Sequence, residues 1–225
     1  MNDTTHTPTT KPQARIFDLG LSDYEKARQL QLQMVDRVIA GEAPDTFIFT
    51  SHPPTITVGR GSDVANILAS DEELQKRGVA KYEVERGGDV TFHGPGQQIV
   101  YPIVNLEQRG RDLHKFLRDL EEVVILFLKE YSIEGERIAG KTGVWVGGKK
   151  ICAIGIAVKR WVSYHGLALN LDTDLSYFQL INPCGFAPDS VTSLTEVAGS
   201  AVDRSRVFYQ LSNSIEKVFG VTLVL

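Results

Sequence analysis

The sequence predicts an α+β fold in which a mixed, largely antiparallel sheet is flanked by helices. Segments of strand character outnumber helical segments, and several strands follow one another as hairpins as well as alternating with helices. No internal repeat, low-complexity linker or break in charge divides the 225 residues. A chain of this length can bury about 70% of the surface that its unfolded form exposes. We therefore expect a disordered tail at residues 1–13 and a single domain at residues 14–225.

Apolar residues at helical spacing predict four helices. The first ends at Gly41, a short second one ends at Gly78, and the last covers residues 203–219. The longest apolar stripe lies at residues 112–131. Two of these helices are preceded by predicted capping boxes, which pair Ser22 with Glu25 and Ser70 with Glu73.

Short runs rich in β-branched and aromatic residues predict the strands. The segment 143–158 forms a hairpin, because Gly147 and Gly148 suit a tight primed turn. The other strands are predicted at "ARIFDLG" (14–20), "DTFIFTSH" (45–52), "TITVG" (55–59), "AKYEVER" (80–86), "IVYPIVN" (99–105), "SYHGLALNL" (163–171) and "VTLVL" (221–225).

Composition and charge exclude several classes of protein. The net charge of −4 argues against a general nucleic-acid binder. Five histidines and two cysteines show neither HExxH nor CxxC spacing, so we expect no metal site. No apolar run of about 18 residues could span a membrane, and the polar N-terminus lacks the apolar core of a signal peptide. We expect a cytoplasmic protein with reduced thiols and no membrane association.

The glycine-rich segment 86–98 carries four glycines in 13 residues, together with Arg86, Thr91 and His93. A wide hairpin loop is the commoner meaning of such a run, and a backbone surface that a ligand approaches closely is the alternative. The segment has neither the GxxxxGK[ST] nor the GxGxxG pattern, so phosphate binding is not indicated. We expect His93, which precedes Gly-Pro-Gly, to line the wall of a pocket.

The two thiols stand in different contexts. Cys152 lies in the middle of a predicted strand and is expected to pack in the core, whereas Cys184 lies on the loop "INPCGF". A thiolate is nucleophilic, and a nearby cation favours it. Strict alternation along "GKKICAIGIAV" places Lys150 on the same inward face as Ile154 and Ile156. Lys150 is therefore a candidate partner for Cys184, although the sequence does not show that they meet.

Two further groups of residues have both a structural and a functional interpretation. His165 is more often a core histidine, but the adjacent Gly166 and Ala168 could leave room for an apolar chain. Asn170 is a candidate for holding a loop. Basic residues without an intervening acid form either a solvated surface or a docking site for an acidic partner. They are Lys141, Lys149, Lys150, Lys159 and Arg160, and Arg109, Arg111, Lys115 and Arg118 could contribute in the same way.

The chain resembles the lipoyl(octanoyl) transferases of lipoate biosynthesis over residues 14–196. Six segments carry this resemblance, in the order found in that family: "HPPTITVGRG" (52–61), "RGGDVTFHGPGQQIVYP" (86–102), "GKTGVWV" (140–146), "GKKICAIGI" (148–156), "HGLALN" (165–170) and "INPCGF" (181–186). Cys152 departs from the family, which usually has a small apolar residue at that place.

The resemblance implies the fold of the biotin/lipoate protein ligase catalytic domain and no cofactor. The reaction would transfer an octanoyl or lipoyl group from acyl carrier protein to a lysine ε-amine of a lipoyl domain, through a thioester on Cys184 with Lys150 as the second catalytic residue. Partners would be octanoyl-acyl carrier protein, the lipoyl domains of 2-oxoacid dehydrogenase complexes and the glycine cleavage H protein; we expect a monomer. The implied acyl-binding residues are Arg86, Gly87, Gly88, Asp89, Val90, Thr91, Phe92, His93, Ala153, Ile154, Gly155, Gly166, Leu167 and Ala168, with His165 and Asn170 in support.

Three alternatives remain open from the sequence. An ATP-dependent lipoate-protein ligase of the same fold would need ATP and form no acyl-enzyme. An amidotransferase would move the acyl group between two carrier domains with the same cysteine chemistry. A non-catalytic module that binds a carrier protein would need neither Cys184 nor Lys150.

Overall fold

The computed structural model describes residues 11–183 and 187–225, so Cys184, Gly185 and Phe186 lie outside the described residues, as does most of the predicted tail. Two sheets are present in the described part. The larger has seven strands in the order β10-β1-β2-β6-β9-β8-β7, and the smaller has three in the order β4-β3-β5. In the larger sheet β1 pairs in parallel with β10 and β2, while the remaining pairs are antiparallel. The predicted α+β class with a mixed, largely antiparallel sheet is confirmed.

The elements follow the predicted order closely. The strands are β1 (Gln13–Leu21), β2 (Thr46–Ser51), β3 (Thr55–Val58), β4 (Ala80–Glu83), β5 (Val90–His93), β6 (Gln97–Ile103), β7 (Gly143–Val146), β8 (Lys149–Lys159), β9 (Val162–Asn170) and β10 (Thr222–Val224). The α-helices are α1 (Tyr24–Ile39), α2 (Asp71–Lys76), α3 (Leu113–Lys129), α4 (Leu194–Ala198) and α5 (Arg204–Phe219), and 3₁₀ turns include η1 (Val64–Asn66), η2 (Leu106–Arg109), η3 (Leu175–Leu180) and η5 (Pro188–Ser190).

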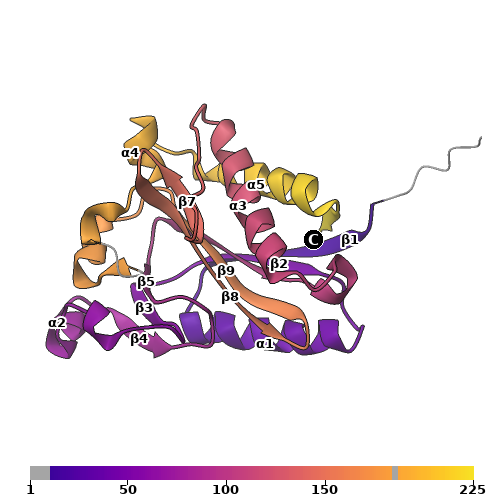
Figure 1. Cartoon of the computed structure of the whole chain (residues 1–225), viewed down its shortest axis with the longest axis horizontal. Helices are drawn as coiled ribbons and strands as arrows, with labels where there is room; N and C mark the ends of the chain where they lie inside the picture. Colours follow the sequence, from indigo (N-terminus) through magenta and orange to yellow (C-terminus); the bar gives the residue numbers. More distant parts are fainter. Residues whose placement is uncertain (1–10, 184–186) are drawn as a thin grey trace, which may run out of the picture.

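Helices cover both faces of the large sheet (Figure 1). Helix α1 lies on one face, and α3 and α5 lie together on the other, while the small sheet and α2 form a separate corner. Side chains of β2 alternate between these two layers: Phe47 and Phe49 pack toward α3 and α5, and Ile48 packs toward α1. Since both faces are covered, the strands read as continuous apolar runs in the sequence.

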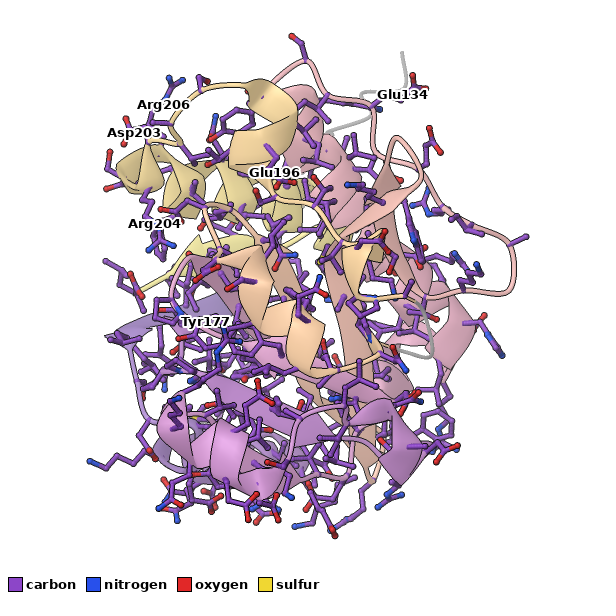
Figure 2. The ribbon with its side chains drawn as sticks, turned by 90° about the vertical axis from the view of Figure 1, so that its left-hand side faces the viewer. Glu134, Tyr177, Glu196, Asp203, Arg204 and Arg206 are labelled. Carbon is purple, nitrogen blue, oxygen red and sulfur yellow. The ribbon has the colours of Figure 1, made fainter. Side chains whose placement is uncertain are left out.

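A third core joins the small sheet to η3. Phe92 of β5 stacks on Tyr177 of η3, with ring centroids 4.8 Å apart, and Tyr177 is labelled in Figure 2. Further along the same part of the chain, Arg204 at the start of α5 pairs with Asp172 at 2.8 Å. These contacts fix the segment that follows β9, which leads to Pro183 and the Cys184 loop.

Most predicted helix ends are confirmed, with one correction. Ser70 caps α2 by accepting a hydrogen bond from the Glu73 amide, as the capping box predicts. Helix α1 is instead capped by Asp23, whose carboxylate accepts from the Lys26 amide. The Ser22–Glu25 box was therefore one residue out of register, because Asp23 is an equally good cap and lies directly before the first buried helical residue, Tyr24.

Strand β1 begins inside the segment that was predicted as a disordered tail. Gln13 pairs with Thr222 in the β1–β10 ladder, and the Pro12 carbonyl accepts a hydrogen bond from the Thr222 amide at 2.9 Å. The tail boundary at residue 13 was thus wrong by at least one residue. No helix in the described ranges is both long and apolar enough to cross a membrane.

The ladder between β6 and β9 is interrupted at Pro102, which has no N–H to donate. Its last paired residues are Val100 and Leu167. Beside the interruption, Gly166 approaches β6 so closely that a Cβ there would lie 2.2 Å from the Val100 carbonyl oxygen and 2.5 Å from Pro102 Cδ. The sequence interpretation of Gly166 as space for a ligand is therefore incomplete, because the approach of two backbones already requires glycine.

Gly166→Ala is expected to lower the free energy of unfolding by about 2–3 kcal/mol, since its methyl group meets backbone that cannot move cheaply. Urea unfolding measures this. Gly87→Ala is the matched control, since a Cβ there would contact only the Ile156 carbonyl, at 3.7 Å. Equal stability of the two variants would show that β6 and β9 adjust without cost.

Candidate active site

A β-bulge sets the direction of the Lys150 side chain. The β7–β8 hairpin turns at Gly147 and Gly148, whose φ angles of 55° and 78° confirm the predicted primed turn. Further into the hairpin Val144 pairs with Cys152 but Trp145 pairs with Lys150, so β8 carries one extra residue at this point.

The bulge overturns the strict alternation predicted for β8. Directly paired residues share a face, so Cys152 joins Val144 in the core against α3, and Lys150 lies on the face of Trp145. The Lys150 ammonium lies 5.0 Å from the centroid of the Trp145 ring. The predicted common face of Lys150 with Ile154 and Ile156 is thus wrong, because the sequence pattern cannot register one extra residue.

Lys150 and the residue before Cys184 line one small cavity. Lys150 is 7% exposed and meets Ala153 and Asn170 on the cavity wall, and Pro183 closes the same cavity. Lys150 is also tied to the chain after the Cys184 loop, because its carbonyl accepts a hydrogen bond from the Thr192 amide at 3.0 Å. Cys184 itself lies outside the described residues, so its distance from Lys150 stays a prediction.

Asn170 holds this corner together. Its amide nitrogen donates to the Thr192 carbonyl at 2.9 Å, and its oxygen accepts from Gln97 Nε2 at 3.0 Å. Gln97 also donates to the Phe92 carbonyl at 3.0 Å. Both side chains are buried, so these bonds link β9, β6 and the segment after the Cys184 loop. This is the loop-holding position that the sequence indicated for Asn170.

A larger, mostly apolar cavity lies beside the small one. The two cavities share Thr91, Ala153 and Ala168 as wall residues, so they adjoin each other at these residues. The larger cavity is lined by Tyr24, Arg86, Gly87, Gly88, Thr91, His93, Ile99, Tyr101, Ala153, Ile154, Gly155, His165, Gly166, Leu167 and Ala168.

The glycine-rich segment divides between this cavity and the core. Thr91 and His93 line the cavity, whereas Val90 and Phe92 alternate with them into the core beneath the small sheet. Asp89 does not line the cavity and accepts a hydrogen bond from Asn66. Thus three of the eight residues that the resemblance implies in this segment serve the fold, because residues 90–93 form a strand where a wide loop was the commoner expectation.

Arg86 is a buried cation on the cavity wall. Its guanidinium donates to the Thr57 carbonyl and hydroxyl at 2.8 and 2.9 Å and to the Gly87 carbonyl at 3.1 Å. Gly155 allows this arrangement, since a Cβ there would lie 3.0 Å from the Gly87 carbonyl oxygen and 3.1 Å from Arg86 Cδ. The absence of a side chain at Gly155 therefore allows Arg86 and Gly87 to pack directly against β8.

Aromatic and imidazole rings line part of the large cavity. Tyr101 and His165 lie edge to face with centroids 6.5 Å apart. His52 accepts through Nε2 from the Tyr101 hydroxyl at 2.8 Å, because its Nδ1 donates to the Ser22 carbonyl at 2.7 Å. Burial lowers the pKa of His93 well below its usual range and that of His165 to about 4, with nearby Arg86 acting in the same direction. The imidazoles are therefore uncharged near neutral pH.

The lowered pKa of His165 makes stability pH-dependent. Between pH 6.5 and about 4, His165 is protonated in the unfolded chain but neutral in the native protein. The free energy of unfolding therefore falls as the pH falls through this range. His165→Asn removes this titration and tolerates the positive φ of 55°. From pH 7.5 to 5.0 the free energy of unfolding of the unmodified protein is expected to drop by about 2 kcal/mol more than that of the variant. Urea unfolding at both pH values measures the difference, and equal drops would contradict it.

Cys152 is a packing residue, as predicted. It is fully buried, and burial raises the pKa of its thiol far above the usual value. The neighbouring charge of Lys150 lowers the pKa only in part. A thiol held protonated in this way is a poor nucleophile.

The predicted basic patch is not one surface. Strand β8 separates Lys149 from Lys159 by about 33 Å. Lys150 is buried, whereas Lys159 pairs at 2.6 Å with Asp36 of α1. Lys141, Lys149 and Arg160 are also exposed, and Lys149 and Arg160 lie toward opposite ends of β8.

The other basic residues considered for docking pair with acids of the protein. Arg109 pairs with Asp45, and Arg118 pairs with the fully buried Glu121 at 2.6 Å. Glu121 also accepts from the Gly143 amide at 3.1 Å and thereby ties α3 to the strand opposite Lys150. The remaining pairs are Arg111 with Glu107 and Lys115 with Asp119. Its ion pair with Glu121 therefore gives Arg118 a structural role that needs no docking protein.

Several wall residues carried no signal in the sequence. Tyr24 and Tyr101 look like ordinary members of an apolar helix face and an apolar strand, and Ile99 like any core residue. Phe178 and Val191 reach the small cavity from segments that flank the Cys184 loop. Alternation could have paired Tyr101 with Ile99 on one face, but not with a cavity.

Comparison with known proteins identifies the family of the chain. The family model of the lipoyl protein ligase A/B catalytic domain matches residues 23–216. An octanoyltransferase of Syntrophobacter fumaroxidans is 43% identical over 92% of this chain and 90% of its own length. One of Caldicellulosiruptor saccharolyticus is 48% identical over 90% of this chain and 87% of its own. The chain belongs to the octanoyltransferase family. It is therefore an acyltransferase, and octanoyl transfer in lipoate biosynthesis is the activity that its relatives support.

Solved structures of more distant proteins share the fold of this octanoyltransferase-family chain. Lipoate-protein ligase A bound with ATP superposes with a TM-score of 0.73 at 15% identity, over 96% of this chain and 88% of that one. A bipartite lipoate protein ligase from Thermoplasma acidophilum gives 0.73 at 16% identity, over 95% and 86%. These values confirm the lipoate ligase type of fold that the resemblance implied.

Proposed function

We propose that this acyltransferase moves an octanoyl group from acyl carrier protein to a lysine ε-amine of a lipoyl domain, through a thioester on Cys184. The single observation that supports this best is the shared cavity of Lys150 and Pro183, which adjoins the larger apolar cavity, here called the acyl slot. A nucleophile following Pro183 would meet the acyl carbonyl at the mouth of that slot, with a buried lysine beside it.

The first step exchanges one thioester for another. The Cys184 thiol loses its proton, its sulfur attacks the carbonyl carbon of the donor, and a carbon–sulfur bond forms. Collapse of the tetrahedral intermediate breaks the bond to the carrier's thiol, which leaves as a thiolate and takes up a proton. The step is nearly balanced in energy, because a thioester is broken and a thioester is formed.

The second step makes an amide. The neutral ε-amine of the acceptor lysine attacks the acyl-Cys184 carbonyl, a carbon–nitrogen bond forms, and the bond to Cys184 sulfur breaks. The attacking nitrogen gives up one proton, and the Cys184 thiolate regains one. An amide is more stable than a thioester, so the sequence runs forward without ATP or any cofactor.

Lys150 would serve both steps from its place on the small cavity. As an ammonium it stabilises the Cys184 thiolate, and it can relay protons between the sulfur and the entering or leaving group. Each tetrahedral intermediate also needs hydrogen-bond donors for its oxyanion, worth about 3 kcal/mol each. The amides of Gly185 and of the 86–93 segment are the two candidates for this role.

The apolar slot would recognise the acyl tail. Burying a methylene contributes about 0.8 kcal/mol, so an eight-carbon chain can supply several kcal/mol of binding free energy. The predicted partners are octanoyl-acyl carrier protein and the lipoyl domains of 2-oxoacid dehydrogenase complexes and of the glycine cleavage H protein. In support, the distant Thermoplasma ligase was solved as part of a system with its own E2 lipoyl domain.

The deciding experiment needs no ATP. The protein is incubated with octanoyl-acyl carrier protein alone, and intact mass spectrometry detects an octanoyl adduct that hydroxylamine removes. Addition of a lipoyl domain then moves the octanoyl group to it. A strict need for ATP would favour a ligase of the same fold, and absence of any adduct or transfer would favour a carrier-binding module.

A further inference from the structure

The register of strands β8 and β9 orders the wall residues of the proposed acyl slot and allows the distance between them to be estimated. Lys150 of β8 and Asn170 of β9 line the reactive end. The register pairs Ala153 with Ala168 in the middle and Ile156 with His165 beyond it. Ala168 and His165 both line the large cavity, and movement from Ala168 to His165 along β9 leads away from Asn170.

The distance along this path matches an eight-carbon chain. From Ala168 to His165 the strand advances three residues, which is about 10 Å. Seven carbon–carbon bonds of about 1.5 Å, projected along an extended chain, span about 9 Å. An octanoyl group whose carbonyl lies near the walls shared by the two cavities would thus end at the His165 ring.

The rings at this end are held in place. The Tyr101 hydroxyl is bound by His52, and the His165 amide donates to Gln31 Oε1 of α1 at 2.8 Å instead of to a strand. The backbone of His165 is in the left-handed region, with a φ of 55°, beside the ladder interruption at Pro102. Both side chains are almost fully buried, so neither can swing into solvent to admit a longer chain.

Polar groups lie behind the rings. Glu85 pairs with Arg28 of α1, and its second oxygen lies 3.6 Å from His165 Nε2. Within the described part of the chain, His165 Nε2, Glu85 Oε2 and Gln31 Nε2 are buried without a hydrogen-bond partner. Extra methylenes forced into this region would press against polar atoms that need hydrogen bonds, which is unfavourable.

We propose that Tyr101 and His165 form the end wall of the acyl slot and set the length of the chain that is transferred. The inference rests on the proposed function, because it places the acyl carbonyl at the Lys150 end. What it adds is which residues end the slot, and it predicts that donors of ten carbons and more are used less efficiently than the octanoyl donor.

The test compares octanoyl-, decanoyl- and dodecanoyl-acyl carrier protein as donors. His165→Gly removes the ring and keeps a residue that tolerates the positive φ. The ratio of kcat/KM for decanoyl over octanoyl donor is expected to rise at least tenfold, since each newly accommodated methylene is worth about fourfold. Tyr101→Val opens the wall from β6 and should act in the same direction, whereas Tyr101→Phe keeps the ring and should leave the ratio unchanged.

Tyr131→Val is the matched control, because it removes a tyrosine ring that lies away from the cavity and bonds Gln210. Thermal melting identifies the variants that fold. Octanoyl transfer by the unmodified protein reports on the proposed function separately from the chain-length ratio. The end wall is rejected if the unmodified protein uses dodecanoyl donor as well as octanoyl donor, or if the folded wall variants keep its ratio.

Discussion

Cys184→Ala is expected to reduce octanoyl transfer by at least about 10³-fold, because the covalent route is lost with the sulfur. Intact mass spectrometry should at the same time show no octanoyl adduct on the variant. Binding of the donor should persist, since the acyl slot and Lys150 remain in place. The measurement is the rate of octanoylation of a lipoyl domain under saturating donor.

Cys152→Ala is the matched control, as the protein's other thiol is buried on the far face of β8. It should keep both the adduct and most of the transfer. If Cys184→Ala retains substantial turnover, transfer is direct from the carrier to the lysine. If Cys152→Ala loses the adduct instead, the nucleophile has been assigned to the wrong sulfur.

Lys150→Ala is expected to slow transfer by about 10²–10⁴-fold, the usual contribution of a positioned proton donor or acceptor. It should also shift the pH dependence of Cys184 alkylation to higher pH, because a neighbouring cation no longer favours the thiolate. Alkylation by iodoacetamide is followed by mass spectrometry in a Cys152→Ala background, which leaves one reactive sulfur.

Lys149→Ala provides the comparison, since Lys149 is the adjacent residue but is exposed. It should change neither the alkylation profile nor kcat, although it can weaken the binding of an acidic donor in a salt-dependent way. An unchanged alkylation profile in Lys150→Ala would show that Lys150 does not favour the Cys184 thiolate. The bulge in β8 would then have a purely structural role.

The bulge and the ladder interruption share one consequence for the site. Each is a local irregularity of the sheet, and each turns a polar side chain toward a cavity: Lys150 toward the small one and His165 toward the large one. A regular sheet would have placed Lys150 on the face that packs against α3. The protein therefore obtains polar groups in an apolar cavity by irregular pairing.

From its residues alone the chain determined the order of most helices and strands, although not β5 or α4, together with the hairpin at Gly147-Gly148 and the packing role of Cys152. These follow from local patterns of apolar spacing, turn residues and capping groups, which act over a few neighbouring positions. The motifs around Arg86, Lys150, Gly166 and Cys184 likewise identified the family.

Only the packed structure decided which members of those motifs reach the cavity. Val90 and Phe92 went to the core while Thr91 and His93 lined the slot, and the supposed basic patch was divided between two ends of β8. No pattern in the sequence indicated that Tyr24 and Tyr101 would line the cavity or that β8 would bulge before Cys152. The physical reason is that a cavity wall and a bulged register arise from contacts between segments far apart in the chain. The free energies of these contacts depend on both segments and are not encoded in the local pattern of either one.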